Sequence, residues 1–308
     1  MIENKVLDSL ITWASQRNIP ESIKRFSYTF SELGLPRDKS KLNSLQALNL
    51  AEMEISELPD ELFELKNLKY LGLSNNNLTK LPNGIEKLSN LEYLDLGDNS
   101  LTELPEGIIE LKKLKILSIS GNNFSHIENI NAKLQNLDIS NNNFTKVPSC
   151  LFDIKNLKTL YIGENGFDGF PLEVTQIETL VELDFNYHNF VELPQEICNL
   201  KNLKVLHLGN GKLKIIPKEI SELVKLEDIN IEYNELELLP KEISMLQRLK
   251  YLFLPGNRLE TLPKELNKLK KLSECYVEDN PIKFLPKECQ EMVEDDIIIG
   301  IQKEINYI

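Results

Sequence analysis

The stretch "LKYLGLSNNNLTKLPNGIEKLSN", residues 68 to 90, is one complete copy of a unit that recurs along the chain. Its first half follows the pattern LxxLxLxxNxL, and its second half follows LPxxIxxLxx. Eleven units are present, and every step between them is 23 residues except for one of 20. A fixed period of this length predicts one small structural element stacked many times. The units begin at Leu45, Leu68, Leu91, Leu114, Leu134, Leu157, Leu180, Leu203, Leu226, Leu249 and Leu272.

This pattern resembles that of the leucine-rich repeat family, in the 23-residue class found in bacterial repeat proteins and in Ras-pathway scaffolds. The resemblance covers residues 45–286, which hold eleven consecutive near-matches. It implies an α/β fold: a curved, horseshoe-like solenoid with a parallel β-sheet on the concave face. Short helices or extended segments would form the convex face. The usual work of such a solenoid is protein binding without catalysis.

The residues themselves support this fold. Apolar side chains alternate in LxxLxLxx, which predicts a short strand with one buried face. The Asn after each strand lies where the chain must turn, and its amide can satisfy unpaired backbone groups there. We therefore expect an internal asparagine ladder. Its members would be Asn76, Asn99, Asn122, Asn142, Asn165, Asn234, Asn257 and Asn280.

Proline recurs on the outer side of ten units, usually with an acidic residue within two positions. This predicts a helix of one or two turns with Pro as its first helical residue, because Pro needs no hydrogen-bond acceptor there and acids favour a helix N-terminus. The fourth unit differs, because its outer segment "SHIENINAK" (125–133) lacks the Pro and is three residues short. We expect an extended segment there.

The two ends of the chain do not match the repeat, and capping segments are expected because an uncapped array exposes its core. Residues 1–44 are predicted to be a helical N-terminal cap and residues 287–308 a C-terminal cap, with a covering strand at 297–301. The apolar residues that predict the N-terminal helices fall into two sets. They are Val6, Leu7, Leu10, Ile11, Trp13 and Ala14, followed by Ile23, Phe26, Phe30 and Leu33.

Composition narrows the functional classes. The chain has 35 basic and 48 acidic residues, so its net charge is 35 − 48 = −13. Nucleic acid is not an expected partner, because phosphate binding depends on Lys and Arg. No apolar run reaches the length of about 20 residues that a membrane span needs, and no basic start precedes an apolar stretch as in a cleaved secretory signal. Four cysteines without metal-binding spacing favour a reducing compartment, so we expect a cytoplasmic location without cofactor or metal.

The candidate site follows from strand geometry. If places one, four and six of each unit face the core, then places three, five, seven and eight face the concave surface. These columns hold twelve carboxylates and no Lys or Arg, and the aromatic residues gather in repeats six to eleven. We expect this region to bind a basic segment of a protein partner, with aromatic anchors. The predicted site residues are Tyr161, Glu182, Asp184, Tyr187, His207, Asp228, Glu232, Tyr233, Tyr251, Phe253 and Tyr276.

Two histidines receive separate predictions. His188 occupies a ladder position normally held by Asn, and the next repeat has Gly211 at the same place. We expect His188 to cover the turn and the neighbouring gap. His207 lies one strand from Asp184, and nearby acids favour its protonated form. Binding is therefore expected to change between about pH 5.5 and 8, the range in which an ordinary His titrates.

Other functions stay open at this point. Paired carboxylates such as Glu182 and Asp184 could serve a glycosidase, but an open sheet excludes water poorly and offers nothing to separate their pKa values. A carbohydrate or other small ligand could bind to the tyrosines. Some bacterial effectors join similar repeats to a ubiquitin-ligase domain with a catalytic Cys. Only about 22 residues follow the last repeat here, so we expect no such catalytic domain. An effector or adaptor that acts on a host protein and is exported without a cleaved signal stays an alternative.

Overall fold

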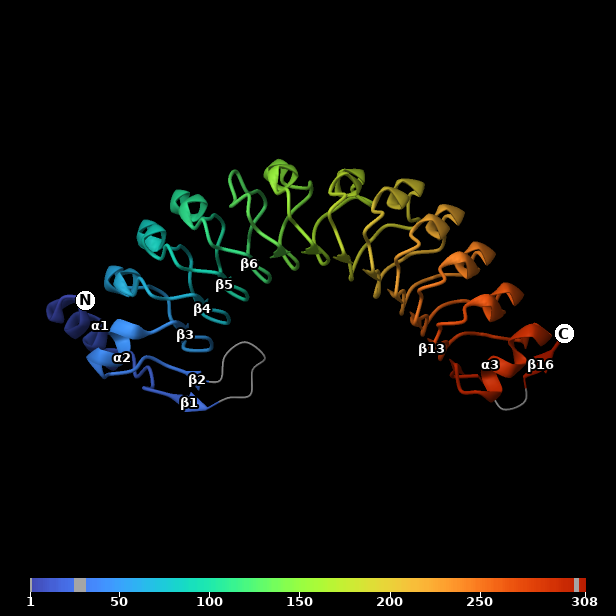
Figure 1. The fold of residues 1–308 in the computed structure, drawn as a ribbon, viewed down its shortest axis with the longest axis horizontal. Helices are drawn as coiled ribbons and strands as arrows, with labels where there is room; N and C mark the ends of the chain where they lie inside the picture. The colour runs from blue at the N-terminus through green and yellow to red at the C-terminus, as the bar shows by residue number, and fades with distance from the viewer. Residues whose placement is uncertain (1, 25–31, 302–304) are drawn as a thin grey trace. The chain divides into compact units, whose positions relative to one another are not determined.

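A computed structural model describes residues 2–24, 32–301 and 305–308. The chain forms two compact units, with Met1–Phe144 and Pro148–Leu157 in unit 1 and Thr145–Val147 and Lys158–Ile308 in unit 2. Within each unit the strands line one side and the short helices the other (Figure 1). Each repeat therefore contributes a strand, a turn and an outer segment, which is the arrangement that the sequence pattern predicts.

The repeats of unit 1 place their strands in a parallel sheet without any shift in register. Leu48 lies opposite Leu71, and Leu71 opposite Leu94, so the same place of successive repeats is aligned. These leucines are buried, and a single repeat could not enclose them alone. The strands are β3 (Ala47–Asn49), β4 (Tyr70–Gly72), β5 (Tyr93–Asp95), β6 (Ile116–Ser118) and β7 (Asn136–Asp138).

Unit 2 repeats this arrangement. Leu183 of one strand is aligned with Leu206 of the next and with Ile229 after that. The side chains on either side of each aligned apolar residue point to the opposite face of the sheet. The strands are β8 (Thr159–Tyr161), β9 (Glu182–Asp184), β10 (Val205–His207), β11 (Asp228–Asn230), β12 (Tyr251–Phe253) and β13 (Glu274–Tyr276).

The asparagine ladder follows the strands as the sequence predicts. Nδ2 of Asn99 donates to the carbonyls of Leu96 and Leu73, and its Oδ1 accepts from the N–H of Leu78, all at 3.0 Å. All eight predicted asparagines donate to the carbonyl three residues earlier in the same way. The ladder thus satisfies backbone groups that the turns would otherwise leave unpaired.

The outer segments form short 3-10 helices. The prediction that the proline is their first helical residue was wrong, because the proline is their N-cap. In η1, for example, the carbonyl of Pro59 accepts the first bond from the N–H of Leu62, at 3.1 Å. The backbone of Pro59 is extended, with φ −78° and ψ 145°, so the proline lies just before the first helical residue. In the described part of the chain these helices are η1 (Asp60–Glu64), η2 (Asn83–Lys87), η3 (Glu106–Glu110), η4 (Ser149–Asp153), η5 (Leu172–Gln176), η6 (Gln195–Asn199), η7 (Lys218–Glu222), η8 (Lys241–Met245), η9 (Lys264–Lys268) and η10 (Lys287–Cys289).

The fourth repeat lacks such a helix. Residues 119–135, all of them described, connect β6 to β7 without helical structure, as the missing Pro predicts. Ile127 and Ile130 are buried in place of the usual helical residues. Asn131 is buried as well, and its Nδ2 donates to the carbonyl of Leu111. The shortened segment therefore still closes the core.

The N-terminal segment begins with the predicted helix, α1 (Asn4–Gln16), which buries Leu7, Leu10, Trp13 and Ala14 and packs against η1. A second helix, α2 (Lys39–Ser44), starts where the side chain of Asp38 accepts bonds from two backbone N–H groups. No helix in the described residues is both long enough and apolar enough to cross a bilayer.

The second predicted apolar set is extended, not helical, at both of its described ends. Ile23 lies on β1 (Ile23–Lys24), which pairs antiparallel with β2 (Glu32–Leu33); Phe26 and Phe30 lie outside the described residues. The helical prediction was therefore wrong for residues 23–24 and 32–33. The reason is the sheet edge: the N–H of Gly34 donates to the carbonyl of Asn49 on β3 at 2.8 Å, and this pairing keeps the segment extended.

The C-terminal segment covers the last repeat strand of unit 2. Strand β15 (Ile298–Ile299) pairs in parallel with β13, as expected for a covering strand at 297–301. A short helix, α3 (Gln290–Glu294), precedes it. Strand β14 (Phe284–Leu285) pairs with β16 (Asn306–Tyr307) in a separate two-stranded sheet.

Candidate functional site

The eleven predicted site residues all lie in unit 2, on the side of the sheet that faces solvent. We call the side chains at places three, five, seven and eight of its repeats the strand face. Eight of the eleven residues lie on strands β8–β13, and Tyr187, Glu232 and Tyr233 lie in the turns that follow. The register aligns the third places Glu182, Val205, Asp228, Tyr251 and Glu274, and the fifth places Tyr161, Asp184, His207, Asn230, Phe253 and Tyr276.

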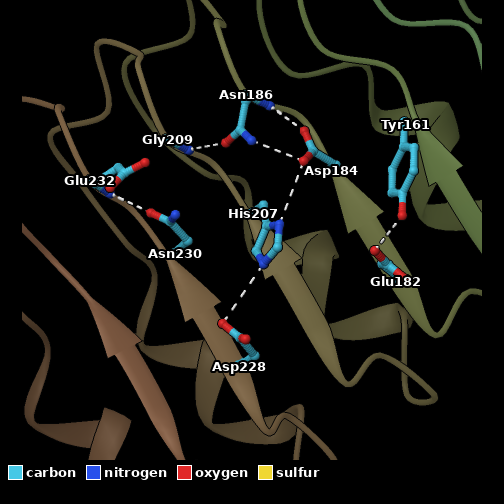
Figure 2. Close-up of polar contacts among 9 residues, drawn as sticks. All are labelled: Tyr161, Glu182, Asp184, Asn186, His207, Gly209, Asp228, Asn230 and Glu232. Carbon is cyan, nitrogen blue, oxygen red and sulfur yellow. Dashed lines mark hydrogen bonds and ion pairs between the residues drawn. The ribbon is translucent and has the colours of Figure 1, made fainter. Parts of the chain in front are cut away.

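Three of the predicted residues form a histidine cluster in the middle of this face (Figure 2). His207 lies between two carboxylates: its Nδ1 is 3.5 Å from Oδ2 of Asp184, and its Nε2 is 3.8 Å from Oδ1 of Asp228. Asp184 comes from the neighbouring strand β9 and Asp228 from β11 on the other side. The two carboxylates therefore hold an imidazolium that belongs to the same chain.

The pKa of His207 is consequently raised to about 9, first by its polar contact with Asp184 and then by that with Asp228, although burial opposes the rise. His207 is thus charged throughout the range from about pH 5.5 to 8 in which an ordinary His would titrate. The predicted direction, a favoured protonated form, is confirmed, but the titration of His207 lies above the predicted range of about pH 5.5 to 8. The physical reason is that two carboxylates stabilise the charged form, where sequence alone pointed to one.

Asn186 fixes the position of Asp184 and is a site residue that the sequence analysis missed. Its backbone N–H and its Nδ2 both donate to the carboxylate of Asp184, at 2.9 Å each. Its Oδ1 accepts a bond from the backbone N–H of Gly209 in the next repeat (Figure 2). The available signal was an amide at place seven with Gly at the same place on both sides, Gly163 and Gly209.

Tyr161 and Glu182 form a separate pair at the start of unit 2. The hydroxyl of Tyr161 donates to Oε1 of Glu182 at 2.7 Å, across neighbouring strands (Figure 2). Both side chains are half-buried. Glu182 is therefore held by a tyrosine, whereas Asp184 is held by a histidine and an amide.

At the other end of the face three rings form what we call the aromatic patch: Tyr251, Phe253 and Tyr276. The rings of Phe253 and Tyr276 are nearly parallel, with centroids 5.2 Å apart and an interplanar angle of 7°. Tyr251 and Phe253 have centroids 6.4 Å apart. The charge of Glu274 beside Tyr276 raises the pKa of that tyrosine. The patch thus combines flat apolar area with an adjacent carboxylate.

The eighth place of every repeat has a left-handed backbone, which the sequence analysis did not predict. The residues there have φ between 50° and 63°. Most are Gly, Asn, Asp or Glu, but Tyr187 (φ 58°) and Tyr233 (φ 50°) are bulky. A large side chain in this conformation is unusual and costs about 1–2 kcal/mol. These two tyrosines are nevertheless the most exposed aromatic residues described, at 59% and 52%.

Tyr233 rests on the backbone of the next repeat. A Cβ added to Gly256 would lie 2.5 Å from Cδ1 of Tyr233, so any side chain at position 256 would collide with the ring. Gly256 also has a positive φ of 63°. The glycine therefore leaves the space in which the tyrosine ring lies, and one face of the ring remains open to solvent.

His188 has the structural role that the sequence predicted. It is buried, stacks on Phe190 with ring centroids 3.6 Å apart, and its Nε2 lies 3.1 Å from the carbonyl of Leu208. A Cβ on Gly211 would lie 2.2 Å from Cε1 of His188, so the imidazole fills the gap left by the glycine. Burial lowers the pKa of His188 to about 4, which keeps the ring neutral.

The described residues contain no group of three or more His, Cys, Asp or Glu arranged to hold a metal ion. The four cysteines are free thiols, and Cys275 and Cys289 are buried. Burial raises the pKa of Cys275 and raises that of Cys289 to about 11. Both thiols are therefore protonated and poorly nucleophilic at neutral pH.

Comparison with known proteins identifies relatives of this architecture. The family described as "Leucine-rich repeat region" matches residues 60–132, and "Leucine Rich Repeat" matches residues 133–154. No curated protein matches the sequence significantly. Among solved structures, a leucine-rich repeat protein of Leptospira interrogans is 32% identical, with 85% of this chain and 86% of that chain covered and a TM-score of 0.56.

Two further structures extend this comparison. An internalin from Listeria monocytogenes has 17% identity and a TM-score of 0.64 over 98% of this chain and 90% of its own. A structure described as a TDR receptor has 25% identity and a TM-score of 0.54, over 79% of this chain and 48% of the receptor chain. The internalin shares the fold alone at this identity, whereas the Leptospira protein is similar in sequence as well.

Proposed function

We propose, from the premise that this chain belongs to the leucine-rich repeat family, that it is a protein-binding scaffold. The strand face of unit 2 receives a basic segment of the partner. Leucine-rich repeat proteins commonly mediate protein–protein interactions, and stacked repeats offer an extended surface for this purpose. The proposal assigns no catalytic step to the chain.

The observation that carries the proposal is the conformation of Tyr187 and Tyr233. Each has a strained left-handed backbone that Asn or Gly would adopt at lower energy, and each leaves more than half of its surface exposed. Strain of this kind is found where function requires a particular side chain. Tyrosine supplies a large and rigid contact area with a polar end, which is typical of interface hot spots.

Charge supports a basic partner. The strand face carries eight carboxylates and no Lys or Arg. Its one cation, His207, is already held by Asp184 and Asp228, so the face as a whole stays negative. Complementary charge increases the association rate and orients the partner. The carboxylates are Glu164, Glu182, Asp184, Asp228, Glu232, Glu274, Glu278 and Asp279.

The test is capture of partners by the purified chain from native lysate, at about 0.1 M and about 1 M salt, where the Debye length falls from about 10 Å to about 3 Å. We expect a partner that is retained at the lower salt and lost at the higher one. The variant Tyr187→Asn/Tyr233→Asn should lose this partner at both salt concentrations.

Asn210→Gly is the matched control, because it changes the same left-handed place in another repeat and leaves both tyrosines and all eight carboxylates intact. This control should retain most of the partner at the lower salt. A partner recovered equally by wild type and by the double tyrosine variant would exclude the proposed placement on the strand face.

A further inference from the structure

Tyr251 of the aromatic patch lies between two carboxylates that are in register with it. Tyr251 on β12 is directly opposite Asp228 on β11 and directly opposite Glu274 on β13. In-register neighbours on adjacent strands are about 5 Å apart. A charge on each side of a flat ring suits a ligand that is itself flat and cationic. Phe253 and Tyr276 extend the apolar area beside Tyr251.

One unsatisfied oxygen atom belongs to Asp228 on β11, and another belongs to Glu278 in the turn after β13. Among the described residues, three buried side-chain N or O atoms have no hydrogen-bond partner, and two of them are Oδ1 of Asp228 and Oε2 of Glu278. The nearest cation to Oδ1 of Asp228 is Nε2 of His207, at 3.8 Å, which is too long for a hydrogen bond. A buried carboxylate oxygen without a donor is costly. Oδ1 of Asp228 is itself closed to solvent, but the Asp228 side chain is 27% exposed, so a ligand that brings N–H groups can still meet this carboxylate.

The chain's own long cations near the patch already have partners. Nζ of Lys250 lies 2.6 Å from Glu227, and the guanidinium of Arg258 lies 3.1 Å from Glu235. In the described part of the chain, no ion pair joins a Lys or Arg to Asp228 or Glu274. Asp228 already has the imidazolium of His207 beside it, at 3.8 Å, but among the residues described neither carboxylate carries a Lys or Arg that a guanidinium from another molecule would have to displace.

We propose that the aromatic patch is a subsite for an arginine side chain of the partner protein, an inference that rests on the proposed function. The guanidinium plane stacks on the exposed ring of Tyr251. Its N–H groups donate to the carboxylates of Asp228 and Glu274, and its aliphatic stem covers Phe253.

Arginine fits this subsite better than lysine for geometric reasons. Its guanidinium is planar, stacks on aromatic rings and donates several N–H bonds in a fixed fork, whereas a lysine ammonium is a compact and strongly hydrated point charge. Stacking on a ring beside a carboxylate uses both properties of the guanidinium at once. The subsite should therefore discriminate between two side chains of equal charge.

The experiment is selection of peptides from a randomised library on the intact purified chain. Arginine should be enriched over lysine among the retained peptides. In the tightest peptide, replacing the selected Arg by Lys should weaken binding about tenfold, and replacing it by the uncharged citrulline should weaken binding further. The substitution Glu274→Gln should reduce the arginine preference and leave folding intact, because Glu274 is only half-buried.

Two aromatic variants separate this subsite from the rest of the face. Tyr251→Ala should abolish the preference for Arg over Lys, whereas Tyr70→Ala on β4 should not, although the two tyrosines are equally exposed, at 38% and 39%. The result that overturns the proposal is equal enrichment of Arg and Lys, or an arginine preference that survives both Tyr251→Ala and Glu274→Gln. If such a protein still captured a partner through Tyr187 and Tyr233, the proposed function would stand without this subsite.

Discussion

Replacing Tyr187 and Tyr233 together by Asn should lower partner binding strongly and change stability little. Asn tolerates the left-handed backbone, so each substitution recovers roughly 1 kcal/mol of the strain that a bulky residue has there. Against this, each tyrosine buries somewhat less than half of its surface. Full burial of such a side chain contributes about 1.5–3 kcal/mol, so its loss costs about 1 kcal/mol. The two effects nearly cancel.

We therefore expect the free energy of unfolding to stay within about 1 kcal/mol of wild type at each site, a melting-temperature change of a few degrees at most. A tyrosine anchor at an interface contributes about 2 kcal/mol or more, so each substitution should weaken binding about 30-fold. Denaturant unfolding and partner affinity, measured on the same samples, give the two numbers. The reasoning is refuted if the variant loses several kcal/mol of stability, because the tyrosines would then be structural.

The remaining predictions concern the two histidines and their surroundings. Gly211→Asn alone should destabilise the chain, because its Cβ would meet the ring of His188. The double variant His188→Asn/Gly211→Asn should regain much of the lost stability, with a coupling free energy of about 1–3 kcal/mol in a double-mutant cycle. Additive effects of the two substitutions would contradict the gap-filling role of His188. The folded-state pKa of His207, about 9, lies above its unfolded value of about 6.5. Its stabilisation, at most about 3 kcal/mol, should be complete below pH 6.5 and disappear as the pH rises through about 9, and His207→Gln should lack this loss. The folded-state pKa of His188, about 4, lies below its unfolded value. The contribution of neutral His188 to the free energy of unfolding should be present above about pH 6.5 and be lost as the pH falls through about 4. The double variant His188→Asn/Gly211→Asn should not show this loss. Finally, His207→Gln removes a positive charge beside Asp228, so it should tighten binding of the arginine peptide severalfold; weaker binding would count against the subsite.

The repeat itself could be read from the sequence because each place in the unit has one dominant physical demand. Leu71 and its equivalents fill a core that no single repeat can close, and Asn99 satisfies backbone groups at a turn that recurs unchanged. Because these demands repeat at a fixed period, an atypical residue in one repeat does not hide the pattern that the other repeats show. The N-terminal segment has no such repetition, and a helical pattern that began at Ile23 did not reveal that Gly34 pairs with the sheet edge.

The candidate site was predictable only as a surface. Strand alternation placed Asp184, His207 and Asp228 on the same face, and the register then brought them within ion-pair distance. The sequence could not show that His207 meets two carboxylates, because its contact with Asp228 is diagonal between neighbouring strands. Nor could alternation show the left-handed turn at Tyr187 and Tyr233, because a strand pattern gives no backbone angle where the strand has ended.

The most direct test of the central claim is site-specific photo-cross-linking in the presence of the captured partner. A photoreactive phenylalanine derivative would replace Tyr251 on β12 in one protein and Met245 on η8 in another; both belong to unit 2, on its strand side and its helix side respectively. The account predicts a covalent adduct with the partner from position 251 and none from position 245, although Met245 is the more exposed of the two. An adduct from position 245 alone would show that the partner binds the opposite side and would contradict the account.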